Sequence, residues 1–360
     1  MDRNTALLWS WLNVLTKRRY DAIREVYGDL ESSTKHVSEE FLRGLGCKEE
    51  TARETLMRME AFDAEMYEKD LAKRSLTFLT IEDSDYPSRL HELPDPPIFL
   101  YARGDLAILE QPLIALVGTR EISAYGRRVV QEFTPAFVSA GMVTVSGLAA
   151  GIDAEVAVQT IKSGGRTVAV LGHGLGMIFP QSNTALAKEI VEEGGLLLTE
   201  FALDISPGKF TFPARNRIIA GLGLGTVVLE AGEGSGAIIT ADLALEYGRD
   251  VFAVPGQIFD PHYAGCHGLI TKGHAKLVTT PQEVLEEIGV VTSTREVVSS
   301  YTPTTPDEEA VFAALTTMPQ QVDDVVERTG LDAPRVGVAL TMMEIAGAAK
   351  NVGGGMWVKG

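Results

Sequence analysis

The chain has only two cysteines in 360 residues, Cys47 and Cys266, and they lie far apart. This excludes a disulfide framework and indicates a reducing compartment. The longest early apolar stretch, TALLWSWLNVL, is shorter than the ~20 residues that a membrane-spanning helix needs. It is followed by KRRY and has no small-residue cleavage site. We therefore interpret it as a helix of a first domain and expect a cytoplasmic protein with no membrane partner.

Positive charge is scarce as well. The sequence has 32 Lys and Arg against 49 Asp and Glu, a formal net charge of −17, and acids outnumber cations in every part of the chain. No domain therefore looks like a nucleic-acid binder by net charge. Any site for a polyanion has to be a local cluster of cations, and salt should weaken its binding.

Two common nucleotide-binding patterns are missing. There is no G-x-x-x-x-G-K-[ST] run, which excludes a P-loop NTPase, and GTREISAYG follows the first apolar strand in place of G-x-G-x-x-G, which argues against NAD or FAD. The group His262, Cys266, His267 and His274 fits no common zinc spacing. We therefore expect neither a cofactor nor a metal.

Apolar positions at helical spacing predict a helical N-terminal domain over residues 1–75. Its segment LRGLGCKEETARETL has a glycine turn between two helical patterns. That segment is either a helix–hairpin–helix that presents amides to DNA phosphate or one turn of a SAM-like helical bundle. Residues 76–112 contain several prolines and predict an extended connector with one short strand, IFLYA.

From residue 113 to 290 near-continuous apolar strands alternate with amphipathic helices. This pattern predicts an α/β fold, a Rossmann-like doubly wound and mostly parallel sheet with helices on both faces. Residues 291–306 are rich in Ser, Thr and Pro and predict a linker. Residues 307–360 show three helical patterns and a Gly-rich hairpin, the order of a winged helix.

The rest of the chain is organised around FPARNRIIAGLGLGTVVLEA, residues 212–231. Arg215 and Arg217 flank Asn216 where an apolar helix begins. A helix N-terminus already carries partial positive charge, so cations at this place fit best with an anion in front of them. Phosphate is the usual anion at such a place.

Further polar and small residues follow other strands of this predicted sheet, whose carboxyl ends meet at one edge. Phe212 lies among the cations, and aromatic side chains between cations suit the stacked bases of a single strand, although Phe residues also pack in cores. We predict a DNA-binding site made of Gly118, Thr119, Arg120, Ser146, Gly147, Lys209, Phe212, Arg215, Asn216, Arg217, Ser235 and Gly236.

Two acids, Glu200 and Glu230, also end predicted strands. They are either catalytic or paired with arginines and helix amides, as buried charges normally are. Without a nucleophile or a metal set nearby we assign no catalytic residue.

Several motifs stand in order along the chain: GTR at 118–120, SGLAAGID at 146–153, FPARNRIIAGLG, and EAGEGSGAIITADLALEYGRDVFAVPG. Together they resemble the DprA/Smf family, the DNA-processing proteins of natural transformation and competence. The chain departs from the family pattern at Ala157, Gly176, Gly223 and His267. No departure removes a cation of the family's basic pocket, which the resemblance maps onto Arg120, Lys209, Arg215 and Arg217.

The resemblance implies a non-enzymatic, homodimeric protein that binds single-stranded DNA, protects incoming strands and loads a RecA-type recombinase for DNA recombination. The alternative is a Rossmann-like enzyme, such as a nucleoside-monophosphate phosphoribohydrolase, with Glu200 or Glu230 catalytic. That class has a PGGxGT-type loop, where this chain has EAGEGSG.

The predicted recognition helix of the winged domain, PRVGVALTMMEIAGA, has Arg335 as its only cation and also carries Glu344. A groove-reading helix normally presents several Arg, Lys, Asn or Gln side chains. We therefore expect an isolated 303–360 fragment not to bind duplex DNA at physiological salt in a gel-shift titration. Tight binding by this fragment would contradict the interpretation.

Overall fold

The computed structural model describes residues 1–290, 301–316 and 318–359. The chain forms two compact units, Met1–Val291 and Thr292–Gly360, each described by itself. Most of the predicted linker 291–306 lies outside the described residues. Within the described parts of the chain, no helix is both long and apolar enough to cross a membrane.

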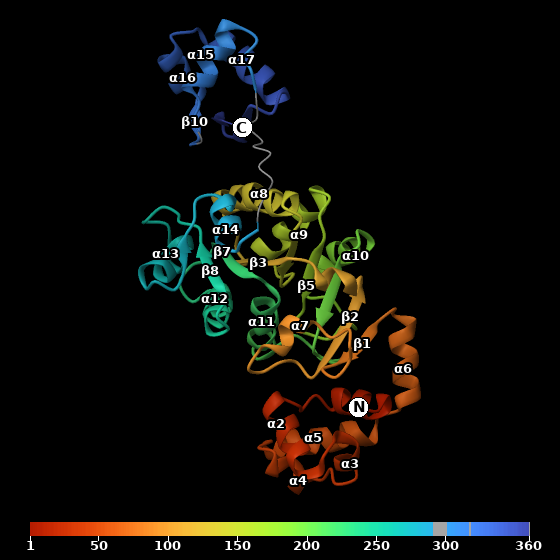
Figure 1. Cartoon of the computed structure of the whole chain (residues 1–360). Coiled ribbons are helices and arrows are strands. Elements are labelled where there is room, and N and C mark those ends of the chain that lie inside the picture. Colours follow the sequence, from red (N-terminus) through yellow and green to blue (C-terminus); the bar gives the residue numbers. More distant parts are fainter. Residues whose placement is uncertain (291–300, 317, 360) are drawn as a thin grey trace. The chain divides into compact units, whose positions relative to one another are not determined.

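The first unit is built on a nine-stranded sheet with the order β1-β2-β6-β5-β4-β3-β7-β8-β9 (Figure 1). Neighbouring strands from β6 to β9 run parallel, whereas β2 runs antiparallel to both β1 and β6. The predicted Rossmann-like, mostly parallel sheet is therefore confirmed. The strands are β1 Thr77–Thr80, β2 Phe99–Gly104, β3 Leu113–Gly118, β4 Val143–Ser146, β5 Thr167–Val170, β6 Leu196–Thr199, β7 Gly225–Glu230, β8 Asp250–Ala253 and β9 Lys276–Leu277.

The proline-rich stretch 76–112 contributes more than the one short strand we expected. It supplies β1 and β2, which extend the sheet beyond β6, and the short helices α7 (Ser88–His91) and η1 (Leu106–Glu110). β2 overlaps the predicted strand IFLYA, and β1 is the strand that we did not expect. The local pattern also did not show that β2 joins the sheet, because its partner β6 lies almost a hundred residues further along the chain.

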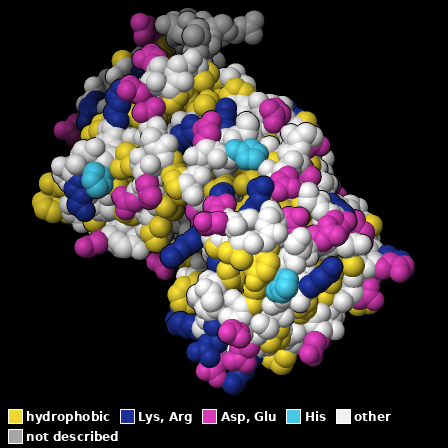
Figure 2. Space-filling model, turned by 60° about the horizontal axis from the view of Figure 1, so that its bottom comes forward, with side chains coloured by type: hydrophobic (Ala, Val, Ile, Leu, Met, Phe, Trp, Pro, Cys, Tyr) yellow, Lys and Arg dark blue, Asp and Glu magenta, His cyan; other side chains and the backbone are white. Residues whose placement is uncertain are grey.

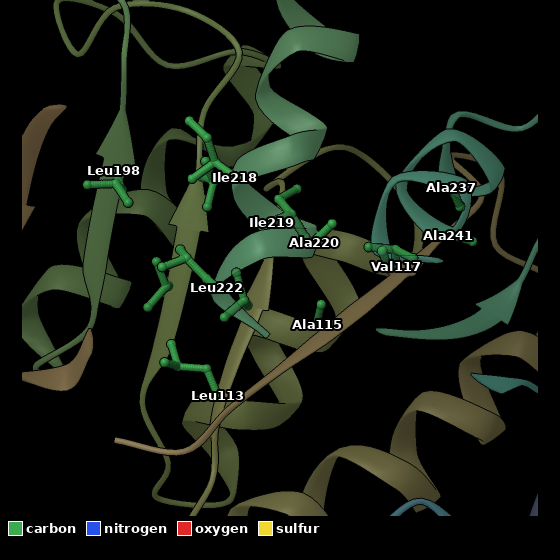
Figure 3. Packing of buried hydrophobic residues seen from close by; sticks show 14 of the residues in the cluster. Leu113, Ala115, Val117, Leu198, Ile218, Ile219, Ala220, Leu222, Ala237 and Ala241 are labelled. Carbon is green, nitrogen blue, oxygen red and sulfur yellow. The ribbon is translucent and has the colours of Figure 1, made fainter. Parts of the chain in front are cut away.

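Helices cover both faces of the sheet, because successive side chains of a strand point to opposite faces. Ile114 and Leu116 of β3 pack with helices α8, α9 and α14, whereas Leu113 and Ala115 pack with α11, α12 and α13 on the other face (Figure 3). The helices of this α/β part are α8 Ala124–Ser139, α9 Ile152–Lys162, η2 Gln181–Asn183, α10 Thr184–Glu192, α11 Thr211–Leu222, α12 Gly236–Glu246, η3 Pro261–Tyr263, α13 Ala264–Thr271 and α14 Pro281–Glu287.

The N-terminal part is helical only, as its apolar spacing predicts. Its core continues into the sheet, because the Tyr67 hydroxyl donates to the Tyr101 hydroxyl of β2 at 3.0 Å and Arg58 pairs with Asp204 at 2.6 Å. The helices are α1 Arg3–Leu12, α2 Lys17–Tyr27, α3 Leu30–Thr34, α4 Glu39–Gly44, α5 Glu49–Glu60 and α6 Ala64–Lys73.

The glycine turn between α4 and α5 is bonded within this bundle. The amides of Leu45, Gly46 and Cys47 donate to carbonyls of α4, and the Arg19 guanidinium donates to the carbonyls of Leu45 and Gly46. The amides that a helix–hairpin–helix would offer to a phosphate are engaged in the fold. The geometry therefore favours the bundle interpretation of this segment.

The second unit has the element order that we predicted for a winged helix. Its elements are α15 Pro306–Ala314, β10 Gln320–Gln321, α16 Val322–Thr329, α17 Ala333–Ile345, β11 Ala349–Gly353 and β12 Met356–Lys359, with strand order β10-β12-β11. On α17, Arg335 pairs with Asp307 at 2.8 Å, while Val338, Met342 and Ile345 are exposed. The helix thus presents apolar side chains and no unpaired arginine.

Candidate functional site

A pocket of about 570 Å³ lies at the carboxyl ends of β3 and β7. The strands from β3 to β6 extend the sheet in one direction, and β7 and β8 extend it in the other. The pocket therefore lies at the point where the strand order reverses, which is where open α/β sheets bind their ligands.

The structure brings most of the predicted site residues to this pocket. Its lining includes Gly118, Thr119, Arg120, Lys209, Phe212, Arg215, Asn216, Ser235 and Gly236. Gly147 lines a smaller cavity beside it. Two predicted residues lie outside both linings. Ser146 is buried and its hydroxyl donates to the Leu116 carbonyl at 2.8 Å, and Arg217 is described below.

Arg215 forms the floor of the pocket. It is only 4% exposed, and its guanidinium donates to the carbonyls of Gly147, at 2.7 Å, and Val170. A Cβ atom at position 147 would overlap this guanidinium, so any larger residue there would displace the Arg215 side chain. Burial lowers the pKa of Arg215 to about 10, partly offset by the charge of Asp153. The side chain remains a cation at neutral pH.

Asp153 compensates this buried charge. Its carboxylate accepts from the amides of Gly147, at 3.1 Å, and Ala149, at 3.4 Å, and it interacts electrostatically with Arg215. Burial raises the pKa of Asp153, and the charge of Arg215 opposes that shift. A buried charge is tolerated when it is paired and hydrogen-bonded in this way. Asp153, in the first turn of α9, thus holds the loop after β4 in addition to interacting favourably with the helix dipole.

Exposed cations and aromatic rings alternate above this floor. The Arg120 guanidinium lies 4.9 Å from the centroid of the Phe212 ring, and Lys209 Nζ lies 5.0 Å from that of Phe210. Phe210 is 77% exposed. Cations and ring faces within one site can contact the phosphates and the bases of the same strand.

Two helices begin at the pocket, and neither has an acid in its first turn. The helix α11 begins at Thr211, earlier than the sequence predicts, so Arg215 and Asn216 lie in its second turn. The side-chain amide of Asn216 donates to the Gly236 carbonyl at the start of α12, at 3.3 Å. Ser235 caps α12 by accepting from the Ala237 amide. The partial positive charge of both helix starts therefore favours an anion in the pocket.

The pocket is not uniformly basic. Its lining contains the acids Glu121, Asp153 and Glu233 besides its three cations. Arg127, which the sequence places close to Arg120, pairs with Glu155. On the face shown in Figure 2, side chains of both charge signs are interspersed. Attraction of a polyanion therefore depends on a few exposed side chains, chiefly Arg120 and Lys209.

Arg217 does not accompany Arg215 into the pocket. It pairs with Glu200 at 2.6 Å and with Asp95 at 3.5 Å, and its side chain is 12% exposed. Residues two apart on an α-helix point to nearly opposite sides, because each residue turns the helix by about 100°. The two arginines look equivalent in the sequence, but Arg215 lines the pocket and Arg217 forms ion pairs outside it.

Glu230 also has a partner away from the pocket. Its buried carboxylate accepts from the Ser123 amide at 3.1 Å, and a Cβ atom at Gly126 would overlap that carboxylate. Glu230 thus fixes the start of α8 against the end of β7. Neither Glu230 nor Glu200 lines the pocket, and both have the structural partners that the sequence left as one alternative.

The histidines and the cysteine between residues 262 and 274 do not gather. His262 pairs with Asp260, and the His267 ring contacts the backbone of Gly256. Among the described residues, no three His, Cys, Asp or Glu side chains are placed to hold a metal ion.

No sequence pattern singled out His173 and Phe179, which line the smaller cavity beside the pocket. The Phe179 amide donates to His173 Nε2 at 3.2 Å, so Nδ1 carries the proton and donates to the Gly174 carbonyl at 3.0 Å. Burial lowers the pKa of His173 and keeps the ring neutral. The Gly-rich run LGHGLG before MIFPQSN was the only local signal of an unusual loop.

Comparison with known proteins shows the family of this chain. Residues 77–289 match the family model "DNA recombination-mediator protein A", and residues 298–355 match the "DprA winged helix domain". Protein Smf of Escherichia coli strain K12 is 38% identical over 75% of this chain and 74% of its own length. DNA processing protein DprA of Streptococcus pneumoniae is 44% identical over 58% of this chain and 73% of its own length.

Solved structures give the same result. The X-ray structure of DNA processing protein A from Streptococcus pneumoniae superposes with a TM-score of 0.66 at 34% identity, covering 80% of this chain and 98% of that chain. The structure of DNA processing protein A from Helicobacter pylori, reported for its single-stranded DNA-binding mode, gives a TM-score of 0.53 at 29% identity. It covers 59% of this chain and 95% of that one.

The lowered pKa of His173 predicts how stability changes with pH. The unfolded chain takes up a proton near pH 6.5, whereas the folded chain does so only at lower pH. The contribution of His173 to the free energy of unfolding is therefore complete above pH 6.5. It decreases as the pH falls below 6.5, by at most about 1.4 kcal/mol per pH unit. We expect His173→Gln to reduce this loss in urea unfolding at pH 7.5, 6.5 and 5.5.

The matched control is His262→Gln. The hydrogen bond to Asp260 raises the pKa of His262, so this side chain does not lose stability as the pH falls. Replacing His262 should therefore leave the decrease in stability at low pH unchanged. Equal pH slopes for the wild type and His173→Gln would contradict the assignment.

Proposed function

Because this chain belongs to the DNA recombination-mediator protein A family, we propose that it binds single-stranded DNA in the pocket at the ends of β3 and β7. One observation carries the proposal. Arg120, after β3, and Lys209, before α11, lie exposed beside aromatic rings, near the buried cation Arg215.

This arrangement favours a single strand over a duplex. Phosphates are attracted by the cations and the helix starts, and each base of a single strand has a face free to stack on Phe210 or Phe212. In a duplex those base faces are covered by neighbouring base pairs. The acids in the lining keep non-specific binding of polyanions weak.

We infer that the protein is not an enzyme. The acids that a nucleotide-processing enzyme would use, Glu200 and Glu230, are engaged with Arg217 and the Ser123 amide. An assay for release of free base from nucleoside monophosphates distinguishes a DNA-binding protein from a phosphoribohydrolase. We expect no release; release that Glu230→Gln abolishes would support the enzyme.

We further propose that the chain acts as a cytoplasmic homodimer in natural transformation, where it protects incoming strands and loads a RecA-type recombinase. The description of its family as a recombination mediator supports this role. Exposed apolar side chains such as Ile258 and Phe259 give one surface that a second copy would cover.

The loading role predicts faster assembly of recombinase on covered DNA. On a single strand precoated with single-strand-binding protein, added wild-type protein should shorten the lag before recombinase filaments form. Sedimentation should give twice the mass of the 38.8 kDa chain. An unchanged lag contradicts loading, and a monomeric mass contradicts the dimer.

Fluorescence anisotropy of labelled oligonucleotides across a salt series tests the site. The wild type should prefer the single strand. Arg120→Glu and Lys209→Glu should each weaken binding and lower the slope of log affinity against log salt by about 0.7 or more, because at least one phosphate contact is lost. Glu233→Gln should tighten binding, because it removes a negative charge from the lining.

The matched control is Lys188→Glu on α10, which makes the same charge change at an exposed lysine outside the pocket. Equal binding by wild type, Arg120→Glu and Lys209→Glu would refute the pocket as the site.

A further inference from the structure

Helix α11 is held on two sides, by Arg215 at the pocket and by Arg217 on the side turned away from it. Arg217 pairs with Glu200, which directly follows β6. The chain between Glu200 and α11 is the loop that carries the exposed side chains of Lys209 and Phe210. The ion pair therefore closes this loop at its base, so the position of Arg217 is linked to that of Lys209.

The pair of Arg217 and Glu200 is not complete by itself. Among the described residues, Arg217 Nη1 and Glu200 Oε1 are buried atoms without a hydrogen-bond partner. A buried charge in this state gains from a further partner of opposite charge. Asp95 supplies it, because its Oδ2 atom lies 3.5 Å from Arg217 Nε.

Asp95 also binds the N-terminal helices. Its Oδ1 atom accepts from the backbone amide of Lys17 at 3.2 Å. Lys17 is the first residue of α2, where a backbone amide has no partner within its own helix. Pro96 restricts the backbone of Asp95, which helps to hold the carboxylate between its two partners. One carboxylate therefore joins the start of α2 to α11.

This link is accessible from solvent. It lies in a groove of about 650 Å³ between α2 and the proline-rich stretch, and the Asp95 side chain is 51% exposed. The other contacts between the N-terminal helices and the sheet include the buried hydroxyls of Tyr67 and Tyr101. The Asp95 link can therefore change while that core stays packed.

We propose that Asp95 is a positioning residue through which the N-terminal helices set the affinity of the pocket for DNA. By holding the Lys17 amide and Arg217 together, it keeps α11 and the loop with Lys209 in the geometry that contacts a strand. This inference rests on the proposed single-stranded DNA function and adds to it a control by residues outside the pocket lining.

Lys17 allows the link to be cut at one atom. Proline is well accepted as the first residue of a helix and has no amide hydrogen, so Lys17→Pro removes the donor to Asp95 and keeps α2. In fluorescence anisotropy with a labelled oligothymidylate, Lys17→Pro should bind about 5-fold more weakly or less well still, from the lower end of typical coupling between sites. Lys17→Ala is the matched control, because it removes the side chain and its charge but keeps the amide. It should bind like the wild type.

Asp95→Ala cuts the same link from its other end and should weaken binding at least as much as Lys17→Pro. Its control is Asp21→Ala, which removes an acid of the same groove that pairs with the side chain of Lys17. Circular dichroism and thermal unfolding confirm that each variant is folded.

A double mutant distinguishes positioning of the loop from a general loss of structure. Because the link acts through the loop that carries Lys209, Lys17→Pro should cost less affinity in a Lys209→Ala background than in the wild type. An equal cost in both backgrounds would overturn the positioning role.

The remaining outcomes separate this inference from the proposed function. A wild type that binds the strand as tightly as Lys17→Pro and Asp95→Ala overturns the link and keeps the DNA pocket. Equal losses in these variants and in their two controls also overturn the link. A wild type that does not bind the strand overturns both proposals.

Discussion

The buried guanidinium of Arg215 is the interaction on which the candidate site depends. It ties helix α11 to the ends of β4 and β5 through two backbone carbonyls. A Cβ atom at position 147 would displace this guanidinium, and the acid at position 153 compensates its charge and holds the loop after β4. Removing one partner of such a buried arrangement typically costs about 3–5 kcal/mol, because the other charge is left without compensation.

This floor is consistent with the polyanion site that we propose for an acidic protein. The chain carries a net charge of −17, and charges of both signs are interspersed on the face shown in Figure 2. The pocket relies on short-range features, namely a buried cation, two helix starts and two exposed cations beside aromatic rings. Such features act over a few ångströms, within the Debye length of about 8 Å at physiological salt.

The arrangement also separates residues that hold the site from residues free to contact a ligand. Arg217 with Glu200, and Glu230 with the Ser123 amide, fix α11 and α8 relative to the sheet. His173 and Asn183 fix the loops around the small cavity. Arg120, Lys209 and the exposed faces of the phenylalanines are then the groups left free to contact a ligand.

The sequence by itself determined the parallel α/β fold, the winged-helix order and the edge of the sheet where the site lies. These follow from local periodicity and from the rule that ligands bind beyond the carboxyl ends of strands. It also identified all three cations of the pocket lining, because cations and small residues at strand ends are visible along the chain.

Only the tertiary structure decided which of these residues face the same space. Neighbours in the sequence such as Arg215 and Arg217 diverge around a helix, and β2 joins β6 across almost a hundred residues. The small cavity could not be predicted from the sequence for the same reason. Its walls come from loops after different strands, and contacts between distant segments leave no periodic trace in the sequence.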